Sequence, residues 1–434
     1  MCFMNIRFCG LAAALVVQCH VFAIVPSMAQ TSSDAEDRVN EVTVDEAWQM
    51  AISNHLPLLL KDKDVEIATA NMKQERLWEN PEVSISHNVN NPVTNRYFEI
   101  NRDGETDIQL SQRIYIGGQR SERIRKATSE LHHAEYERSD AERLLRRELC
   151  GTMVQLAAVR QKMAVVEKEI ASAGKILKAY ENQADKGNVA LMEVVRIRSQ
   201  HVQLLQEKAS LTTDMMELEQ QLQLIMGCDG SMAFAQSHLS PKIDYEASTA
   251  ILANASRTVL LDRLANRADL LADKQDVVTA EHDVKLQKAN SLPELSLTGE
   301  WDKNGNIGHN YFAIGVTMTL PIFNRNQGGR KAAAAALEAK RMSMEWNRRE
   351  AVAEVNRLWN KLTVGHQMAQ EAAKHLASEN EQMMSQIENQ YMKRNISLLE
   401  LLDYYRAYKD NHYLVIESRM NVLQAVVELD MDIK

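Results

Sequence analysis

The chain has 434 residues and a formal net charge of −9 at pH 7, with 45% hydrophobic and 25% charged residues. This acidic balance argues against nucleic acid as a partner, because binding to phosphate groups requires an excess of basic side chains. No stretch beyond the first 29 residues reaches the ~18 uninterrupted apolar residues of a membrane-spanning helix. Contact of that part with a membrane would therefore require β-strands.

Residues 1–29 are predicted to be a signal peptide. Arg7 is their only charged residue, an apolar run follows it, and Ser27-Met28-Ala29 fits the small-residue pattern of a cleavage site. Cys19 raises the alternative of a lipoprotein signal, which Gln18 disfavours because such sites prefer a small residue at that position. We therefore expect cleavage after residue 29.

Two cysteines, Cys150 and Cys228, remain after removal of this segment. They lie at similar distances on either side of a predicted hairpin turn near Gly187, so antiparallel helices would bring them to within about one helical turn of each other. Such a pair can form a disulfide in an oxidising compartment, although two separate structural cysteines are the favoured interpretation.

The first half of the chain begins with a helix and two strands. Residues 42–78 have helical composition with an interruption at Pro57, and Thr43 or Asp45 can cap the helix start. Apolar and polar residues alternate strictly over 82–89 and again over 107–116. This period of two predicts two β-strands.

A very long helix follows the second strand. From Gln119 to Asp185 there is no proline, and apolar residues recur every seven positions. A helix of this length would extend roughly 100 Å and pack lengthwise on its neighbours.

The stretch ENQADKGNVALMEVVR at 181–196 resembles ENQYMKRNISLLELLD at 388–403. Aligned without a gap at a constant offset of 207, the two share seven identical residues. Each contains a polar break, near 187 and near 394, between stretches of helical composition, which is typical of the turn of a helical hairpin. The chain is therefore predicted to be internally duplicated, with one long helical hairpin in each half.

The second half repeats the order of the first. Residues 293–297 match 81–85 and begin a strand, residues 311–322 alternate in the clearest strand pattern of the chain, and a second proline-free run extends from Gly328 to Lys434. The predicted organisation is therefore a signal peptide at 1–29, a first repeat at 30–227, a connector with at most a short helix at 228–256, and a second repeat at 257–434.

Four strands of about ten residues per chain are long enough to cross a bilayer when tilted. Four strands cannot close a barrel, and lipid does not tolerate open sheet edges, so several chains must share one barrel. The predicted fold is mainly α with a membrane β-barrel: the long hairpins form a helical tube, and three chains supply twelve strands. A soluble pair of β-ribbons on a coiled-coil rod is the alternative.

Two further strings indicate a family. LSQRIYIGGQR at 110–120 and LPIFNRNQGG at 320–329, together with the duplication, resemble the TolC-like outer-membrane factors, and within them the branch that serves heavy-metal (cobalt-zinc-cadmium type) exporters. The resemblance covers essentially the whole chain after residue 29. It implies a homotrimer in the outer membrane of a Gram-negative bacterium, with a shared 12-stranded barrel in lipid and an α-barrel in the periplasm.

The implied function is the exit duct of a tripartite efflux system. Such a duct is a passive conduit that docks with a periplasmic adaptor (membrane fusion) protein and an inner-membrane RND transporter, here for heavy-metal cations. A duct for drugs or other small molecules is the alternative within the family. A free-standing porin and a non-conducting periplasmic coiled-coil protein are alternatives outside it.

The residues predict no enzyme, cofactor or resident metal. His132 and His133 are adjacent and therefore point to different sides of a helix, which does not suit joint ligation of a metal. Methionines on the heptad stripes are interpreted as packing residues, because their flexible side chains fill gaps between helices.

The resemblance also implies a periplasmic gate at the tips. Glu400 and Asp403 match two acids that ring the closed entrance. Tyr391 matches a gate tyrosine, and Glu193 matches its acidic partner in the other hairpin. Ile396 departs from the pattern, because drug-exporting relatives have a gate arginine there. On the residues alone, acids spaced i, i+3 are more often a solvated helix face.

Two other sets of residues complete the expected sites. Small or polar residues at the tips resemble the grooves that receive the adaptor: Gly187, Asn188, Ala190, Asn395 and Ser397. Apolar positions of the strands are expected to face the membrane: Ile108, Leu110, Ile314, Val316 and Met318.

Overall fold

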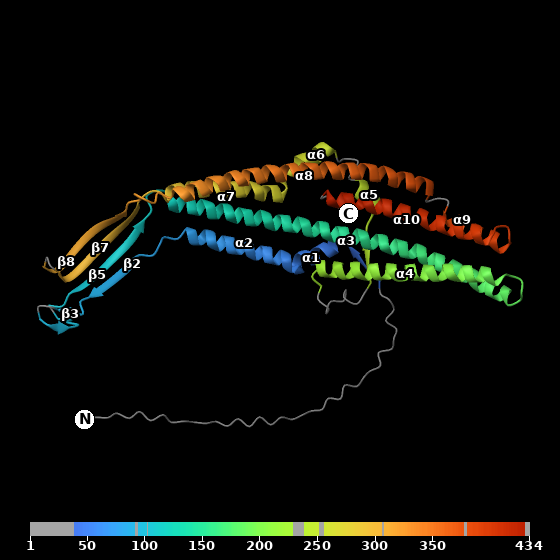
Figure 1. Ribbon diagram of the computed structural model, residues 1–434, viewed down its shortest axis with the longest axis horizontal. Coiled ribbons are helices and arrows are strands. Elements are labelled where there is room, and N and C mark those ends of the chain that lie inside the picture. The colour runs from blue at the N-terminus through green and yellow to red at the C-terminus, as the bar shows by residue number, and fades with distance from the viewer. Residues whose placement is uncertain are drawn as a thin grey trace, which may run out of the picture. The chain divides into compact units, whose positions relative to one another are not determined.

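The structure is a computed structural model, and it describes residues 39–91, 94–101, 103–228, 238–250, 256–305, 308–376 and 380–429. The expected signal peptide lies outside these residues. Most of these residues are helical, and the structure also contains one four-stranded sheet (Figure 1).

The chain enters the helical part through α1 (Val44–Asn54) and α2 (Leu56–Glu75). Of the two caps predicted, Thr43 is used: its hydroxyl oxygen accepts the amide of Glu46 at 3.3 Å, and the Glu46 carboxylate accepts the amide of Thr43 at 3.0 Å. The predicted interruption is also present, since Pro57 lies in the first turn of α2. A proline is tolerated there because its missing N–H would have no helical partner.

The sheet has strand order β2-β5-β7-β8, and all neighbouring strands are antiparallel. Its members are β2 (Glu82–His87), β5 (Thr106–Ile114), β7 (Glu294–Gly305) and β8 (Gly308–Thr319). A small hairpin of β3 (Asn90–Asn91) and β4 (Arg96–Tyr97) lies between β2 and β5 in the sequence. The two halves of the chain therefore contribute two strands each, as the duplication predicts. Strand β8 ends earlier than predicted, since Pro321 has no N–H for a ladder.

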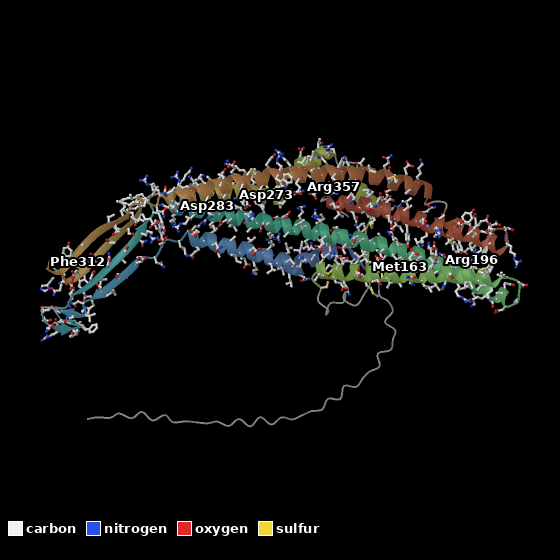
Figure 2. The ribbon with its side chains drawn as sticks, in the orientation of Figure 1. Met163, Arg196, Asp273, Asp283, Phe312 and Arg357 are labelled. Carbon is white, nitrogen blue, oxygen red and sulfur yellow. The ribbon has the colours of Figure 1, made fainter. Side chains whose placement is uncertain are left out.

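The register places the predicted apolar positions on one face of this sheet. Ile314 pairs with Gly299, and Gly299 pairs with Leu110. Directly opposed residues of antiparallel strands share a face, so the alternations of all four strands combine. The shared apolar face contains Val83, Ile85, Ile108, Leu110, Leu295, Leu297, Trp301, Phe312, Ile314, Val316 and Met318. Figure 2 labels Phe312 on it.

Helix α3 (Gln119–Ala184) has 66 residues and is the longest helix that the structure describes. It contacts α2, α4 (Leu191–Ile225), α7 (Ala268–Ala289) and α10 (Leu398–Glu428). Helices α8 (Gln327–Leu376) and α9 (Asn380–Met392) complete the second hairpin with α10. At 1.5 Å per residue α3 is roughly 100 Å long. The sheet lies at one end of these helices and the two tips lie at the other (Figure 1).

The main hydrophobic core lies midway along α3, where the helices of the first hairpin pack against those of the second. Fully buried side chains there come from α3, α4, α8 and α10, and they include Leu149, Met153, Leu156, Leu222, Leu358 and Val422. Cys150 belongs to this core, Cys228 packs against it, and no disulfide joins the two. The favoured interpretation of two separate structural cysteines is therefore what the structure shows.

A two-stranded parallel sheet was not predicted. Strand β1 (Val39–Thr43) pairs with β6 (His238–Lys242), and a short helix α5 (Tyr245–Ala250) follows. The prediction of a connector with at most a short helix was wrong for β6. The two strands are too short and too polar to show a period of two. Almost the whole first half of the chain separates them in the sequence. Beyond α5, α6 (Arg257–Arg263) and a 3-10 turn (Leu264–Asn266) lead into α7.

Across the described ranges, none of the helices combines the length and the apolar character needed to cross a membrane.

Candidate functional site

The two hairpin tips have the same backbone geometry. In the first tip, Gly187 has a left-handed φ of +73°, and the amide of the next residue donates to the carbonyl oxygen of Gln183 at 2.9 Å. In the second tip, Arg394 has a φ of +60°, and the following amide donates to the carbonyl oxygen of Gln390 at 2.9 Å. Both are Schellman-type helix ends, which satisfy carbonyl groups that a helix C-terminus leaves open.

The duplication extends to side-chain contacts. Asn188 Nδ2 donates to Gln183 Oε1 at 2.9 Å, and Asn395 Nδ2 donates to Gln390 Oε1 at 2.6 Å. Arg394 Nη2 also donates to the carbonyl oxygen of Asn188 at 3.4 Å. The two tips of one chain are therefore adjacent and are connected by a polar contact.

The five residues expected to receive an adaptor all lie in these two turns and are all exposed: Gly187, Asn188, Ala190, Asn395 and Ser397. Three of them already use their side chains within the chain, since Asn188 and Asn395 bond to glutamines and Ser397 caps α10. Their exposed surface and backbone stay available, and docking at this position stays a prediction.

Helix α10 begins with a reciprocal capping box. Ser397 Oγ accepts the amide of Glu400 at 3.3 Å, and Glu400 Oε2 accepts the amide and hydroxyl of Ser397 at 2.7 and 2.8 Å. The two hydrogen bonds that Ser397 donates to the carboxylate lower the pKa of Glu400, and the bond from the backbone amide has the larger effect. Sequence reasoning assigned Glu400 to the gate and missed this second role, although Ser-x-x-Glu before an apolar run is the signature of such a cap.

The first tip lacks this cap. Ala190 occupies the position before α4 that Ser397 occupies before α10, and it offers no side-chain acceptor. Glu193 corresponds to Glu400 in the duplication, and its side chain is half-buried. The two hairpins therefore have matching backbones and different helix starts.

Tyr391 is packed against the other hairpin. Its ring stacks on Tyr180 of α3, and only 3% of its surface is exposed. Burial raises its pKa, with further contributions from Tyr180 and from the negative charge of Glu193. The Tyr391 hydroxyl has no hydrogen-bond partner among the described residues, so the expected bond to Glu193 is not formed within a single chain.

A small hydrophobic cluster surrounds the stacked rings. Its buried members are Ile176, Ile197, Tyr391, Leu398, Leu401 and Tyr405, and the half-buried Ile396 packs against them. Asp403 is exposed and lies one turn after Glu400 on α10, so both acids share the outer side of the helix. Sequence reasoning named both acids and Tyr391, and it missed Tyr180, whose partner in the duplication is Ile387.

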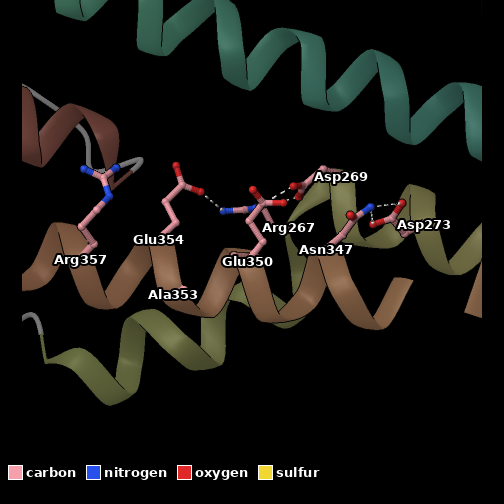
Figure 3. A pocket seen from close by; sticks show the side chains of 9 residues that line it. Arg267, Asp269, Asp273, Asn347, Glu350, Ala353, Glu354 and Arg357 are labelled. Carbon is pink, nitrogen blue, oxygen red and sulfur yellow. Dashed lines mark hydrogen bonds and ion pairs between the residues drawn. The ribbon is translucent and has the colours of Figure 1, made fainter. Parts of the chain in front are cut away.

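An open groove of about 520 Å³ lies between α7 and α8, away from the tips (Figure 3). Arg267 holds both carboxylate oxygens of Asp269 at 2.8 and 2.7 Å and reaches Glu354 at 3.5 Å. Asn347 holds Asp273, whose pKa burial raises. Three of the six charged side chains that line the groove, Arg267, Asp269 and Glu354, are thus paired with one another.

No cluster of three or more metal-ligating side chains occurs in the part of the chain that the structure describes.

Comparison with known proteins identifies the family. A model of the outer membrane efflux protein family matches residues 47–228 and 259–431. The chain is 22% identical to the cobalt-zinc-cadmium resistance protein CzcC of Cupriavidus metallidurans over 290 residues, which cover 66% of this chain and 65% of CzcC. It is 21% identical to the pyoverdine export outer membrane protein OpmQ of Pseudomonas aeruginosa over 236 residues, 51% of this chain and 46% of OpmQ. The chain thus matches less than two thirds of the length of either relative.

The fold is also found in solved structures. The outer membrane protein VceC of Vibrio cholerae has a similar structure, with a TM-score of 0.69 and 16% identity over 89% of this chain and 94% of VceC. The mainly helical, internally duplicated fold and the family predicted from the sequence are therefore confirmed. On the match of its two halves, this chain belongs to the outer membrane efflux protein family.

Proposed function

We propose that this protein is the outer-membrane exit duct of a tripartite efflux system, and that it works as a passive conduit. The observation that carries this proposal is the four-stranded sheet at the end of the long helices. One face of the sheet is apolar, the other carries residues such as Ser84, Gln109 and Thr317, and its outer strands β2 and β8 have no further strand beside them among the described residues.

Such a sheet is incomplete as a monomer. Unpaired strand edges cannot remain in lipid, because each open N–H or C=O group there costs several kcal/mol. Pairing β8 of one chain with β2 of the next removes all edges once the ring closes. Three chains give a barrel of twelve strands, within the size range of outer-membrane barrels. The membrane-facing positions Ile108, Leu110, Ile314, Val316 and Met318 would then contact outer-membrane lipid.

The same three chains would place six hairpin tips around one axis. These tips would form the gate, and they would dock with a periplasmic adaptor and an inner-membrane RND transporter. Glu400 and Asp403 would contribute a ring of negative charge. The cap favours the ionised form of Glu400, because hydrogen bonds from Ser397 lower its pKa. A negative mouth attracts cations and repels anions.

The closed state needs a contact that offsets this repulsion. The Tyr391 hydroxyl is buried and has no partner within hydrogen-bond distance among the described residues, and leaving such a donor without a partner costs roughly 1 to 3 kcal/mol. A hydrogen bond to Glu193 of a facing hairpin would satisfy it. Tyr391 and Glu193 are therefore the proposed latch.

Heavy-metal cations are the proposed cargo. The name of CzcC and the negative tips support this choice. Drugs or other small molecules are the second candidate, which the name of OpmQ favours.

The test is the mass and conductance of the purified protein. We expect a trimer by light scattering in mild detergent and cation-selective channels in a planar bilayer. A monomeric mass would contradict the shared barrel, and a trimer without conductance would favour a structural coiled-coil protein. Tolerance of a host to cobalt, zinc and cadmium, with and without the gene and its pump, would separate the two cargo classes.

A further inference from the structure

Glu169 of α3 is an acid buried in the helical bundle. Only 1% of its surface is exposed, and its Oε1 has no hydrogen-bond partner among the described residues. Glu219, another buried glutamate, differs because Arg160 donates to it at 2.9 Å. A carboxylate without such a partner is costly in a protein interior.

Glu169 lies where α3 meets α4 and α10, the helices on either side of it in Figure 1. Lys409 Nζ of α10 donates to Glu207 of α4 at 2.7 Å, and the Tyr413 hydroxyl donates to the same carboxylate at 2.9 Å. One turn along α3, Ser172 Oγ lies 2.5 Å from the Tyr405 hydroxyl of α10. We call these six residues the polar seam: Glu169, Ser172, Glu207, Tyr405, Lys409 and Tyr413.

The charges around Glu169 do not balance its own. Glu207 of α4 and Asp410 of α10 are the negative neighbours, and Lys409 is the positive one. The ammonium group of Lys409 is already bonded to Glu207. Other titratable groups nearby are the hydroxyls of Tyr405, Tyr408 and Tyr413 and the ring of His412, which packs edge-on against Tyr408. Glu388 of α9 adds a further negative charge and accepts a hydrogen bond from Ser172. An ionised Glu169 therefore leaves excess negative charge inside the bundle.

We propose that the proton of Glu169 locks α10 onto the α3–α4 hairpin, and that loss of this proton loosens the polar seam. A neutral carboxyl group removes the repulsion from Glu207 and Asp410 and can donate a hydrogen bond. The seam then holds the two hairpins together along the stretch that leads to the tips.

The sign and the pH range follow from the environment. Burial is the main cause that raises the pKa of Glu169 from 4.5 to about 7, and Lys409 opposes it. A carboxyl group with a higher pKa in the packed state binds its proton there, so protonation stabilises the packing. This stabilisation is greatest below pH 4.5 and is lost as the pH rises through about 7.

Hydrogen–deuterium exchange of the full-length protein in detergent tests the lock. We expect amides of 405–413 in α10 to exchange roughly 30-fold faster at pH 8.5 than at pH 5.5, after correction with an unstructured peptide for the intrinsic pH dependence. Glu169→Gln, which keeps the shape and cannot ionise, should abolish this excess. Lys409→Met should move the midpoint to higher pH, since it removes a cation that favours the ionised form.

Glu167→Gln is the matched control. Glu167 lies on the same helix, is solvent-exposed, and pairs with Lys208 at 2.7 Å, so its loss should leave the pH response unchanged. A pH response that persists in Glu169→Gln, or a wild-type protein with no response, would overturn the lock. A midpoint that stays in place in Lys409→Met would also overturn it.

Because α10 also carries Glu400 and Asp403, the lock would act on the proposed gate, a consequence that depends on the proposed duct. Exchange in α10 reports on the lock by itself. The pH dependence of bilayer conductance reports on the gate, so failure of one can be recognised without failure of the other.

Discussion

The rings of Tyr180 and Tyr391 stack across the two hairpins of one chain, with centroids 5.1 Å apart and ring planes at 7°. Tyr180 lies near the end of α3 and Tyr391 near the end of α9, just before the two tips. Movement of the second hairpin away from the first must break this contact. The stack therefore couples the two tips mechanically.

Replacing Tyr180 with leucine should weaken this coupling. The variant keeps an apolar side chain but loses the ring pair, which contributes roughly 0.5 to 1.5 kcal/mol beyond buried area. We expect faster hydrogen exchange at 388–405 and an unchanged fold. Tyr404→Leu is the control, because Tyr404 is exposed and outside the cluster. Equal effects of both substitutions would show that the stack adds no stability.

Replacing Tyr391 with phenylalanine separates the hydroxyl from the ring. The stack is kept, while the proposed bond to Glu193 is removed, and a bond to a charged acceptor contributes roughly 1.5 to 3 kcal/mol. We expect larger or more frequent openings in planar bilayers. If the hydroxyl has no partner in the trimer either, the variant will be as stable as the wild type or more so, and conductance will not change.

The helix starts offer a matched pair of substitutions. Ser397→Ala should cost about 1 kcal/mol of stability at the start of α10, whereas Ala190→Ser should stabilise α4 by creating a Ser-x-x-Glu box with Glu193. Local hydrogen exchange at each helix start measures both. The pKa of Glu400 is lowered, so its part of the cap is present above pH 4.5 and is lost as the pH falls below it. Opposite or absent changes would show that the caps do not limit local stability.

The acids on α10 should control ion selectivity. We expect the double variant Glu400→Gln with Asp403→Asn to weaken cation selectivity and block by multivalent cations at low salt, where screening is least. Glu338→Gln, an exposed acid on α8, is the control. Reversal potentials across a salt gradient are the measurement. Wild-type values in the double variant would mean that these acids form a solvated helix face and do not line the mouth.

The apolar face of the sheet should be sensitive to charge. Ile314→Arg or Val316→Arg should reduce the amount of assembled protein in the outer membrane, since a cation near the bilayer midplane costs roughly 2 to 4 kcal/mol in each chain. Thr317→Arg introduces the same charge on the opposite face of β8 and should be tolerated better. Equal yields of all three variants would show that the predicted face does not contact lipid.

Much of this architecture can be predicted from local patterns in the sequence. Strict alternation around Leu110 and Ile314 determined the strands and the apolar face, because a period of two can bury only one side of a sheet. The repeated segments at 181–196 and 388–403 determined the duplication and the two tips, down to the matching Asn188 and Asn395 contacts.

Other features depend on contacts between distant segments. The pairing of β1 with β6, the stack of Tyr180 on Tyr391 and the burial of Glu169 between α4 and α10 have no local signature. A period of seven shows that a residue faces a neighbouring helix, but it does not identify which helix that is or what charge it presents. The three-dimensional packing alone decided which polar side chains of the long helices were left without water, since desolvation depends on neighbours that are hundreds of residues away.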